Sequence, residues 1–188
     1  MTDPDCFDLY AAAMTSTEEL LERIDVSWHK LRPALIAGQL GSRLADGRTV
    51  KETLAGIAFW NETVAPVFAW MRGQPELPAG QWYGGADLGI GDGEPWPKDE
   101  VHHAREAAWA RSVSDGEVLS RLDRAHHHAV AAVATLTAGE CRPGPGPAGN
   151  TGIDPDHAWA RLTSSERMVS KADSCTYRLY DALLQQLP

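Results

Sequence analysis

The sequence predicts an all-α protein, a four-helix bundle with long Gly/Pro-rich crossover loops. Alanine is abundant and runs of β-branched residues are scarce, which favours helix over sheet. Four segments carry apolar residues at helical spacing, and each begins with a Ser or Thr followed three residues later by Glu, the capping-box pattern. Amphipathic helices of this kind bury their apolar faces by packing against one another, which makes a bundle the expected arrangement.

The capping boxes set the expected start of each helix. The four pairs are Ser16/Glu19, Thr49/Glu52, Ser114/Glu117 and Thr163/Glu166. The helices that follow are expected over residues 16–38, 49–71, 114–137 and 163–187. Pro33 is expected to kink the first helix and Pro66 to bend or split the second, because proline lacks the N–H that an interior turn needs. Pro97 suits a first helical position and predicts a further helix over 98–112, joined to the next one or broken near 112–114.

Two Gly/Pro-rich segments, residues 73–97 and 138–157, are expected to be loops. The first contains Trp82, Tyr83 and Trp96, and disordered linkers are usually poor in tryptophan. These aromatic residues therefore favour a lid over a cavity or a segment packed on the end of the bundle. No domain boundary is visible, so residues 1–188 are expected to form one domain, with residues 1–15 as a short leader.

The composition excludes several classes of function. The net charge of −9 argues against binding to a nucleic-acid backbone. No apolar run approaches the roughly 20 residues that span a bilayer, and the acidic N-terminus does not look like a signal peptide, so no membrane partner is expected. The three cysteines lie far apart and form neither a disulfide framework nor a zinc pattern. A cytoplasmic location fits these features best.

Three stretches carry a family resemblance: residues 49–60 (TVKETLAGIAFW), residues 99–136, and residues 177–183 (YRLYDAL). In order, they resemble the second helix, the third-helix region and the end of the last helix of the DinB-like superfamily of four-helix bundles. This superfamily includes the mycothiol-dependent maleylpyruvate isomerase domains. The resemblance covers about residues 15–187.

Metal-binding members of that superfamily hold a divalent metal with three histidines, at the positions of Gly56, Leu179 and Leu183 in this chain. None of these three residues can ligate a metal, so we expect neither a metal nor another cofactor. The chain is more similar to the metal-lacking ClbS/DfsB-like group, which protects its producer against a genotoxic, cyclopropane-bearing natural product. The shared features are Trp60, the tryptophan-rich connector, and a last helix without paired histidines.

His126 lies on the apolar stripe of its helix and is our candidate for a general base that activates water, together with Tyr177 or Asp173. The alternative is a core histidine that is satisfied by a hydroxyl such as that of Tyr177. His102 and Glu106 share one helical face and are either a weak ligand or metal site or a surface pair. The candidates for binding a substrate are Trp60, Gly56, His102, Trp109 and Tyr180.

We therefore expect a ClbS-like detoxification protein that binds an electrophilic natural product in the bundle core and opens its strained ring with water. One alternative is a stress protein that sequesters such a ligand without turnover. The other is a degenerate thiol-dependent transferase or isomerase that binds metal elsewhere, for example through His102 and Glu106. A homodimer is left open, because no surface stripe requires one.

Overall fold

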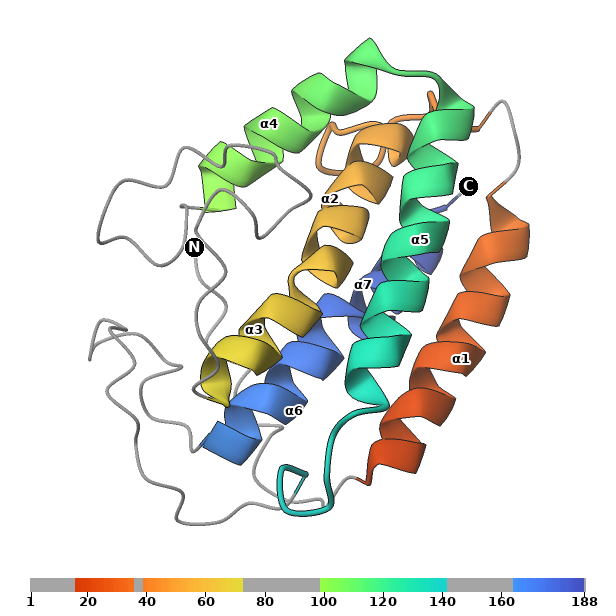
Figure 1. Ribbon diagram of the computed structural model, residues 1–188. Coiled ribbons are helices and arrows are strands. Elements are labelled where there is room, and N and C mark those ends of the chain that lie inside the picture. The colour runs from red at the N-terminus through yellow and green to blue at the C-terminus, as the bar shows by residue number, and fades with distance from the viewer. Residues whose placement is uncertain (1–15, 36–38, 73–98, 142–163, 188) are drawn as a thin grey trace.

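Figure 1 shows the computed structural model, which describes residues 16–35, 39–72, 99–141 and 164–187. Within these ranges the secondary structure is helical, with no strand and one isolated bridge between Arg43 and Thr49, which confirms the all-α prediction. The helices are α1 (Thr17–Ala34), α2 (Val50–Glu62), α3 (Val64–Met71), α4 (Asp99–Ser112), α5 (Asp115–Val133), α6 (Ser164–Cys175) and α7 (Tyr177–Leu184).

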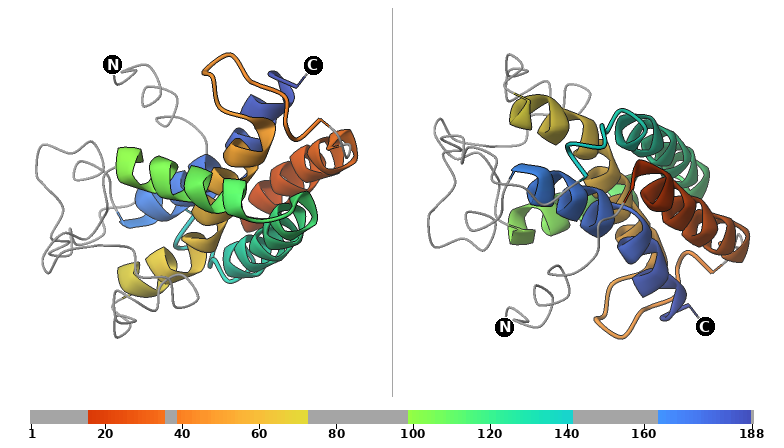
Figure 2. Two further views of the ribbon diagram at one scale, coloured as in Figure 1. Left: turned by 90° about the horizontal axis from the view of Figure 1, so that it is seen from above. Right: turned by 90° about the horizontal axis from the view of Figure 1, so that it is seen from below.

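The seven described helices lie around a common core, with α3 packed on α5 and α6 (Figures 1 and 2). α2 lies between α5 and α4 and packs on both, while α1 packs on α7 and α5. The consecutive helices α6 and α7 run along the far side of the view in Figure 1, and α4 crosses α2 at an angle. The largest side chains that are fully buried between these helices include Leu20, Ile24, Leu54, Phe59, Phe68, Leu122, Tyr180 and Leu183. No described helix combines the length and the apolar character that crossing a bilayer requires.

Three of the predicted capping boxes are present. Ser16, Thr49 and Ser114 each accept a hydrogen bond from the backbone N–H of the glutamate three residues later, and that glutamate accepts one in return. These reciprocal bonds satisfy amide groups that a helix start otherwise leaves unpaired. The fourth pair begins at Thr163, outside the described residues, as do the leader, the 73–97 loop and most of the 138–157 loop.

Proline positions explain two helix ends. α1 ends at Ala34, one residue after Pro33, rather than near residue 38. The second predicted helix is split at Thr63 into α2 and α3. Pro66 has no N–H for the carbonyl of Glu62, four residues earlier, and its ring would clash with that carbonyl, so the helix breaks one turn before the proline.

α5 also ends earlier than predicted, at Val133 rather than near residue 137.

The last predicted helix is also divided, which the sequence did not predict. Thr176 has φ −129° and ψ −108°, which are not helical, and it separates α6 from α7. Its hydroxyl donates to the carbonyl of Ala172. The N–H of Leu179, which would reach the Cys175 carbonyl in a continuous helix, donates to the Thr176 carbonyl instead, at 3.0 Å. The Cys175 carbonyl is thereby left for another partner.

Candidate functional site

Three buried side chains from three helices form a hydrogen-bonded chain, which we call the His126 relay. His126 Nδ1 of α5 lies 3.1 Å from the hydroxyl of Tyr180 on α7. That hydroxyl donates to Oδ1 of Asn61 on α2. Asn61 Nδ2 in turn donates to the Cys175 carbonyl, 2.6 Å away, at the break between α6 and α7. The break therefore provides the terminal acceptor of the relay.

The relay has one direction. A backbone carbonyl can only accept, so the amide nitrogen of Asn61 must face Cys175 and its oxygen must face Tyr180. Tyr180 has a single hydroxyl hydrogen, which it gives to Asn61. His126 Nδ1 must then carry a hydrogen and donate to Tyr180, which leaves the lone pair of the neutral ring on Nε2.

His126 is 6% exposed and stacks on Trp28 of α1, with ring centroids 3.9 Å apart and planes at 6°. Burial lowers the pKa of His126 to about 4, so the ring is neutral near pH 7. These contacts agree with the alternative of a core histidine, because the ring is buried and hydrogen-bonded to a tyrosine hydroxyl. The tyrosine is Tyr180, however, and not the Tyr177 that the sequence suggested.

Asp173 and Tyr177, the other two predicted catalytic residues, lie in a different cluster. The Tyr177 hydroxyl is 3.5 Å from Nη1 of Arg23, and Oδ2 of Asp173 is 3.7 Å from Nη2 of Arg178. Asp173 also interacts with Tyr177, and burial raises the pKa of both groups. The structure thus does not join His126, Tyr177 and Asp173 into one hydrogen-bonded group.

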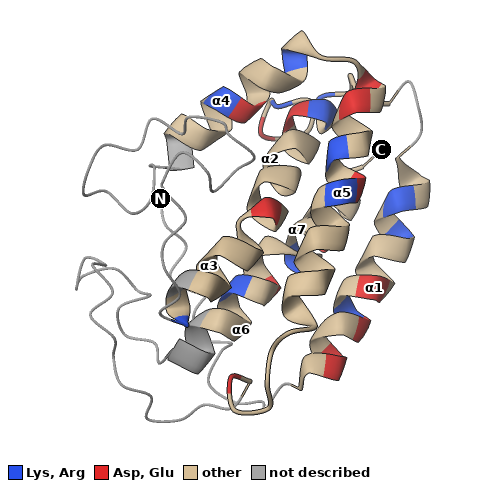
Figure 3. Cartoon of the chain, in the orientation of Figure 1, with Lys and Arg blue, Asp and Glu red and all other residues tan. Residues whose placement is uncertain are grey.

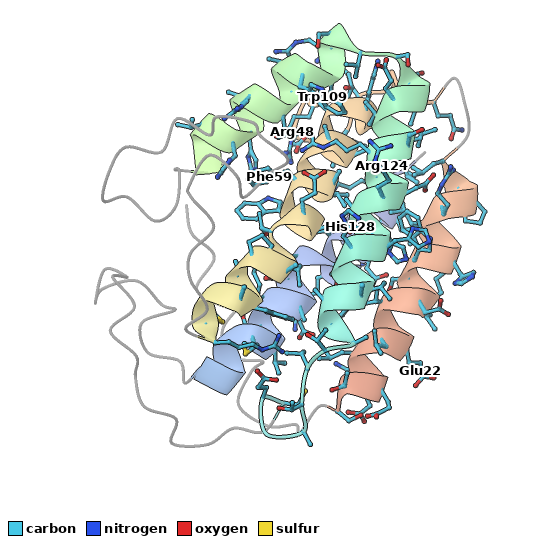
Figure 4. All side chains as sticks on the ribbon, viewed as in Figure 1. Glu22, Arg48, Phe59, Trp109, Arg124 and His128 are labelled. Carbon is cyan, nitrogen blue, oxygen red and sulfur yellow. The ribbon has the colours of Figure 1, made fainter. Side chains whose placement is uncertain are left out.

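Two predicted binding residues, Trp60 and His102, do meet, in what we call the Trp60 cluster, which also contains Phe59 and Lys171, with Glu106 one helical turn after His102. The His102 ring lies 4.2 Å from Phe59 and 5.6 Å from Trp60, measured between ring centroids. The ammonium of Lys171 on α6 lies 4.9 Å from the Trp60 ring centroid, within the range of a cation–π contact. His102 and Lys171 are each 2% exposed, whereas Trp60 is half-buried. Figure 4 labels Phe59 on α2, beneath α4.

Glu106 lies one helical turn after His102 and is 6% exposed. Arg121 of α5 donates to it at 2.5 Å and holds Glu62 with two bonds of 2.7 and 2.9 Å. Burial raises the pKa of Glu106 against the opposing effect of Arg121. The Arg121 guanidinium also lies 4.5 Å from the centre of the Trp109 ring. Trp109 therefore packs on this ion cluster.

Gly56 has no described neighbour at the position of its missing side chain. A Cβ added to Gly56 would meet no described atom within 4 Å. Gly56 precedes Trp60 by four residues on α2, so both residues lie on one face of that helix. Leu183, which the resemblance aligns with a metal ligand, is 1% exposed in the core. Among the described residues no three His, Cys, Asp or Glu side chains come together as a metal site, and Glu106 is engaged by Arg121.

Sequence reasoning did not identify Asn61, Trp28 or Lys171 as site residues. Asn61 is a polar residue within an apolar run, which is a usable signal of a buried hydrogen bond, but its partners lie 114 and 119 residues away. From the sequence alone, Lys171 resembles a surface lysine, because its contact with Trp60 depends on how α6 packs.

No family model, curated protein or solved structure matches the chain.

Proposed function

We propose that this protein is a DinB-like four-helix bundle of the ClbS/DfsB-like kind, which binds an electrophilic small molecule against Trp60 and opens its strained ring with water. The observation that carries the proposal is the Trp60 cluster. Two buried side chains that can bear charge, His102 and Lys171, lie against one half-buried indole. Polar groups gathered around an aromatic surface beside open space are typical of small-molecule sites.

The roles follow from the chemistry of each group. Trp60 offers a flat apolar surface for the ligand, and the space beside Gly56 gives it room. Water attacks a carbon of the strained ring, and its proton passes to the imidazole of His102 as the new C–O bond forms. The ring C–C bond breaks, and the released electron pair takes the proton back from His102. The Lys171 ammonium stabilises the negative charge that develops between these two steps.

His126 is the alternative base for the same reaction. The relay leaves the Nε2 lone pair of His126 available in the neutral ring, which is the state that a general base needs. Trp28 covers one face of that ring, so a substrate would have to reach Nε2 past the stacked indole. Substitution of each histidine separates the two assignments.

Non-catalytic binding of the same ligand is a second candidate function. The burial of His102 favours it, since only 2% of the residue is exposed and an attacking water needs room beside the imidazole. Sequestration would use Trp60 and the space at Gly56 in the same way, and it would leave the ligand unchanged or bound once per chain.

The test is mass spectrometry of products after the tag-free full chain is incubated with a panel of strained-ring DNA alkylators. Repeated formation of a ring-opened product that contains one added water supports the hydrolase. Unchanged compound that co-elutes with the protein, or one adduct per chain, supports sequestration. Absence of both binding and conversion across the panel contradicts the proposal.

A further inference from the structure

A surface groove of about 800 Å³ lies between the 39–49 loop and α4, with the start of α2 between them. Its volume falls within the roughly 300–1,000 Å³ that is usual for small-molecule sites. Neither Trp60 nor His102 is among the described residues that line it, so the groove is separate from the Trp60 cluster.

The groove is lined by more cationic than anionic side chains. The cations are Arg43, Arg48, Lys51 and Arg111, and the acids are Glu52 and Asp115. The chain as a whole carries a net charge of −9, so this excess opposes the overall sign. Figure 3 shows both kinds of charge around the loop that leads into α2 and around the start of α5.

The two acids of the groove already have partners. Lys51 Nζ lies 2.9 Å from Asp115 Oδ1 and also donates to a backbone carbonyl. Arg111 pairs with Glu52, which in addition accepts the capping-box hydrogen bond at the start of α2. Neither carboxylate is therefore available to balance the remaining cations of the groove.

Arg48 is balanced by Asp46 of the same loop, 2.6 Å away, so Arg43 is the cation whose charge stays unbalanced. Its Nη1 donates to the carbonyl of Gly47 at 2.6 Å, and no carboxylate of the described residues lies within ion-pair distance of it. The other donors of a guanidinium point outward in a planar fork, which suits the two oxygens of a carboxylate or a phosphate.

The loop that carries Arg43 has a defined shape before any ligand arrives. Arg43 forms an antiparallel bridge with Thr49, and the N–H of Leu44 donates to the carbonyl of Arg48 at 2.8 Å. Gly47 turns the chain with a φ of +85°, which a side chain would disfavour. A preformed wall reduces the ordering cost of binding.

The groove also has apolar lining. Leu40 lies at its wall but is fully buried, so the accessible apolar side chains are those of Ala104 and Ala107. These residues offer contact area to a hydrocarbon group but no hydrogen bond. A purely inorganic anion would leave this part of the groove unused.

We infer that this groove binds a small organic anion, in which a carboxylate or phosphate contacts Arg43 and an attached apolar group covers Ala104 and Ala107. Arg43 and Arg111 are exposed, so salt should weaken the binding. The site does not depend on the hydrolytic function, because none of the residues that line it belongs to the Trp60 cluster.

NMR titration of the full chain tests the inference with four probes: benzoate, phenyl phosphate, benzyl alcohol and inorganic phosphate. We expect saturable shifts from benzoate, phenyl phosphate or both, confined to amides of residues 40–52 and 103–115, and the stronger probe names the anion. Benzyl alcohol and inorganic phosphate should bind at least about tenfold more weakly, because each lacks one of the two contacts. Equal binding of benzyl alcohol, or shifts centred elsewhere, would overturn the inference.

Arg43→Gln should weaken the binding of the tighter probe about tenfold. Arg43→Lys should weaken that binding less, since lysine keeps the charge but lacks the planar fork of donors. Arg124→Gln is the matched control, because Arg124 is exposed on α5 and does not line the groove (Figure 4). His102→Gln should leave the titration unchanged, so failure of the hydrolytic proposal and failure of this one are distinguishable. Unchanged affinity in Arg43→Gln, with retained dispersion of the spectrum, would rule out Arg43 as the anion contact.

Discussion

Tyr180 donates its hydroxyl hydrogen to Asn61 across 119 residues of sequence, and this bond fixes the orientation of everything attached to it. Because Asn61 is anchored on the Cys175 carbonyl, the hydrogen of Tyr180 points towards α2 and that of His126 points towards Tyr180. A bond between α7 and α2 thus sets the tautomer of a histidine on α5.

Asn61→Leu should destabilise the fold by about 2–4 kcal/mol, since it leaves the Tyr180 hydroxyl and the Cys175 carbonyl buried without their partner. Tyr180→Phe should cost about 1–3 kcal/mol for the same reason. Urea unfolding gives both values. The double variant should cost less than the sum of the two single variants, because the shared bond can be lost only once. Additive costs would show that the bond does not contribute.

Stability should fall as the pH is lowered through the range in which His126 titrates. The folded pKa of about 4 lies below the usual 6.5, so the unfolded chain binds more protons between these values. The contribution of His126 is complete above about pH 6.5 and is lost towards pH 4. We expect a loss on the order of 2–3 kcal/mol.

Urea unfolding at about pH 7.5 and about pH 4.5 measures this loss. His126→Gln should remove most of the pH dependence, whereas His128→Gln, an exposed change on the same helix, should keep it. Glu106 and Asp173 act in the opposite direction, because their raised pKa values favour the fold at low pH. Comparison with His126→Gln separates the histidine from these carboxyls. An unchanged slope in that variant would contradict the prediction.

Arg121→Leu should destabilise the protein by about 3–5 kcal/mol, because Glu62 and Glu106 would be left close together without their shared cation. Arg124→Leu on the exposed face of the same helix should change the stability by no more than about 0.5 kcal/mol. Adding Glu106→Gln to Arg121→Leu should recover part of the loss, and no recovery would argue against carboxylate repulsion. Thermal or urea unfolding reports each difference.

Gly56→Ala should stabilise the protein by about 0.5–1 kcal/mol, since alanine favours the helix and its Cβ meets no neighbour. The Gly56→Leu variant should also fold, but the leucine side chain would fill the space beside Trp60 and weaken the binding of any ligand there. Gly116→Ala is the control, because it makes the same substitution at a glycine of another helix, α5. A loss of stability in Gly56→Ala, measured by urea unfolding, would show that the space is not open.

The sequence predicted the features that depend on neighbouring residues. Each capping box joins two residues three positions apart, so Thr49 and Glu52 could be paired from the sequence alone. Pro66 likewise acts on the turn next to it. The division at Thr176 could not be predicted in this way, because the hydrogen bond to the Cys175 carbonyl comes from Asn61, on another helix.

The candidate site shows the same division. Trp60 and His102 were identified by residue type and helical face, and the structure brings them together. Lys171 was missed, because its contact with Trp60 depends on how α6 is placed. His126 was given the wrong tyrosine, since Tyr177 and Tyr180 are both compatible with a one-dimensional stripe and only packing against α1 and α5 distinguishes them.

The most direct measurement is the turnover rate of whichever alkylator in the panel is opened, compared between the wild-type chain, His102→Gln, His126→Gln and His128→Gln at equal concentrations. If His102 is the base beside Trp60, His102→Gln should lower the rate by about 10²-fold or more, while His126→Gln and the exposed control stay near the wild-type rate. Retained turnover in His102→Gln together with its loss in His126→Gln would contradict the placement of the chemistry in the Trp60 cluster and assign it to the relay.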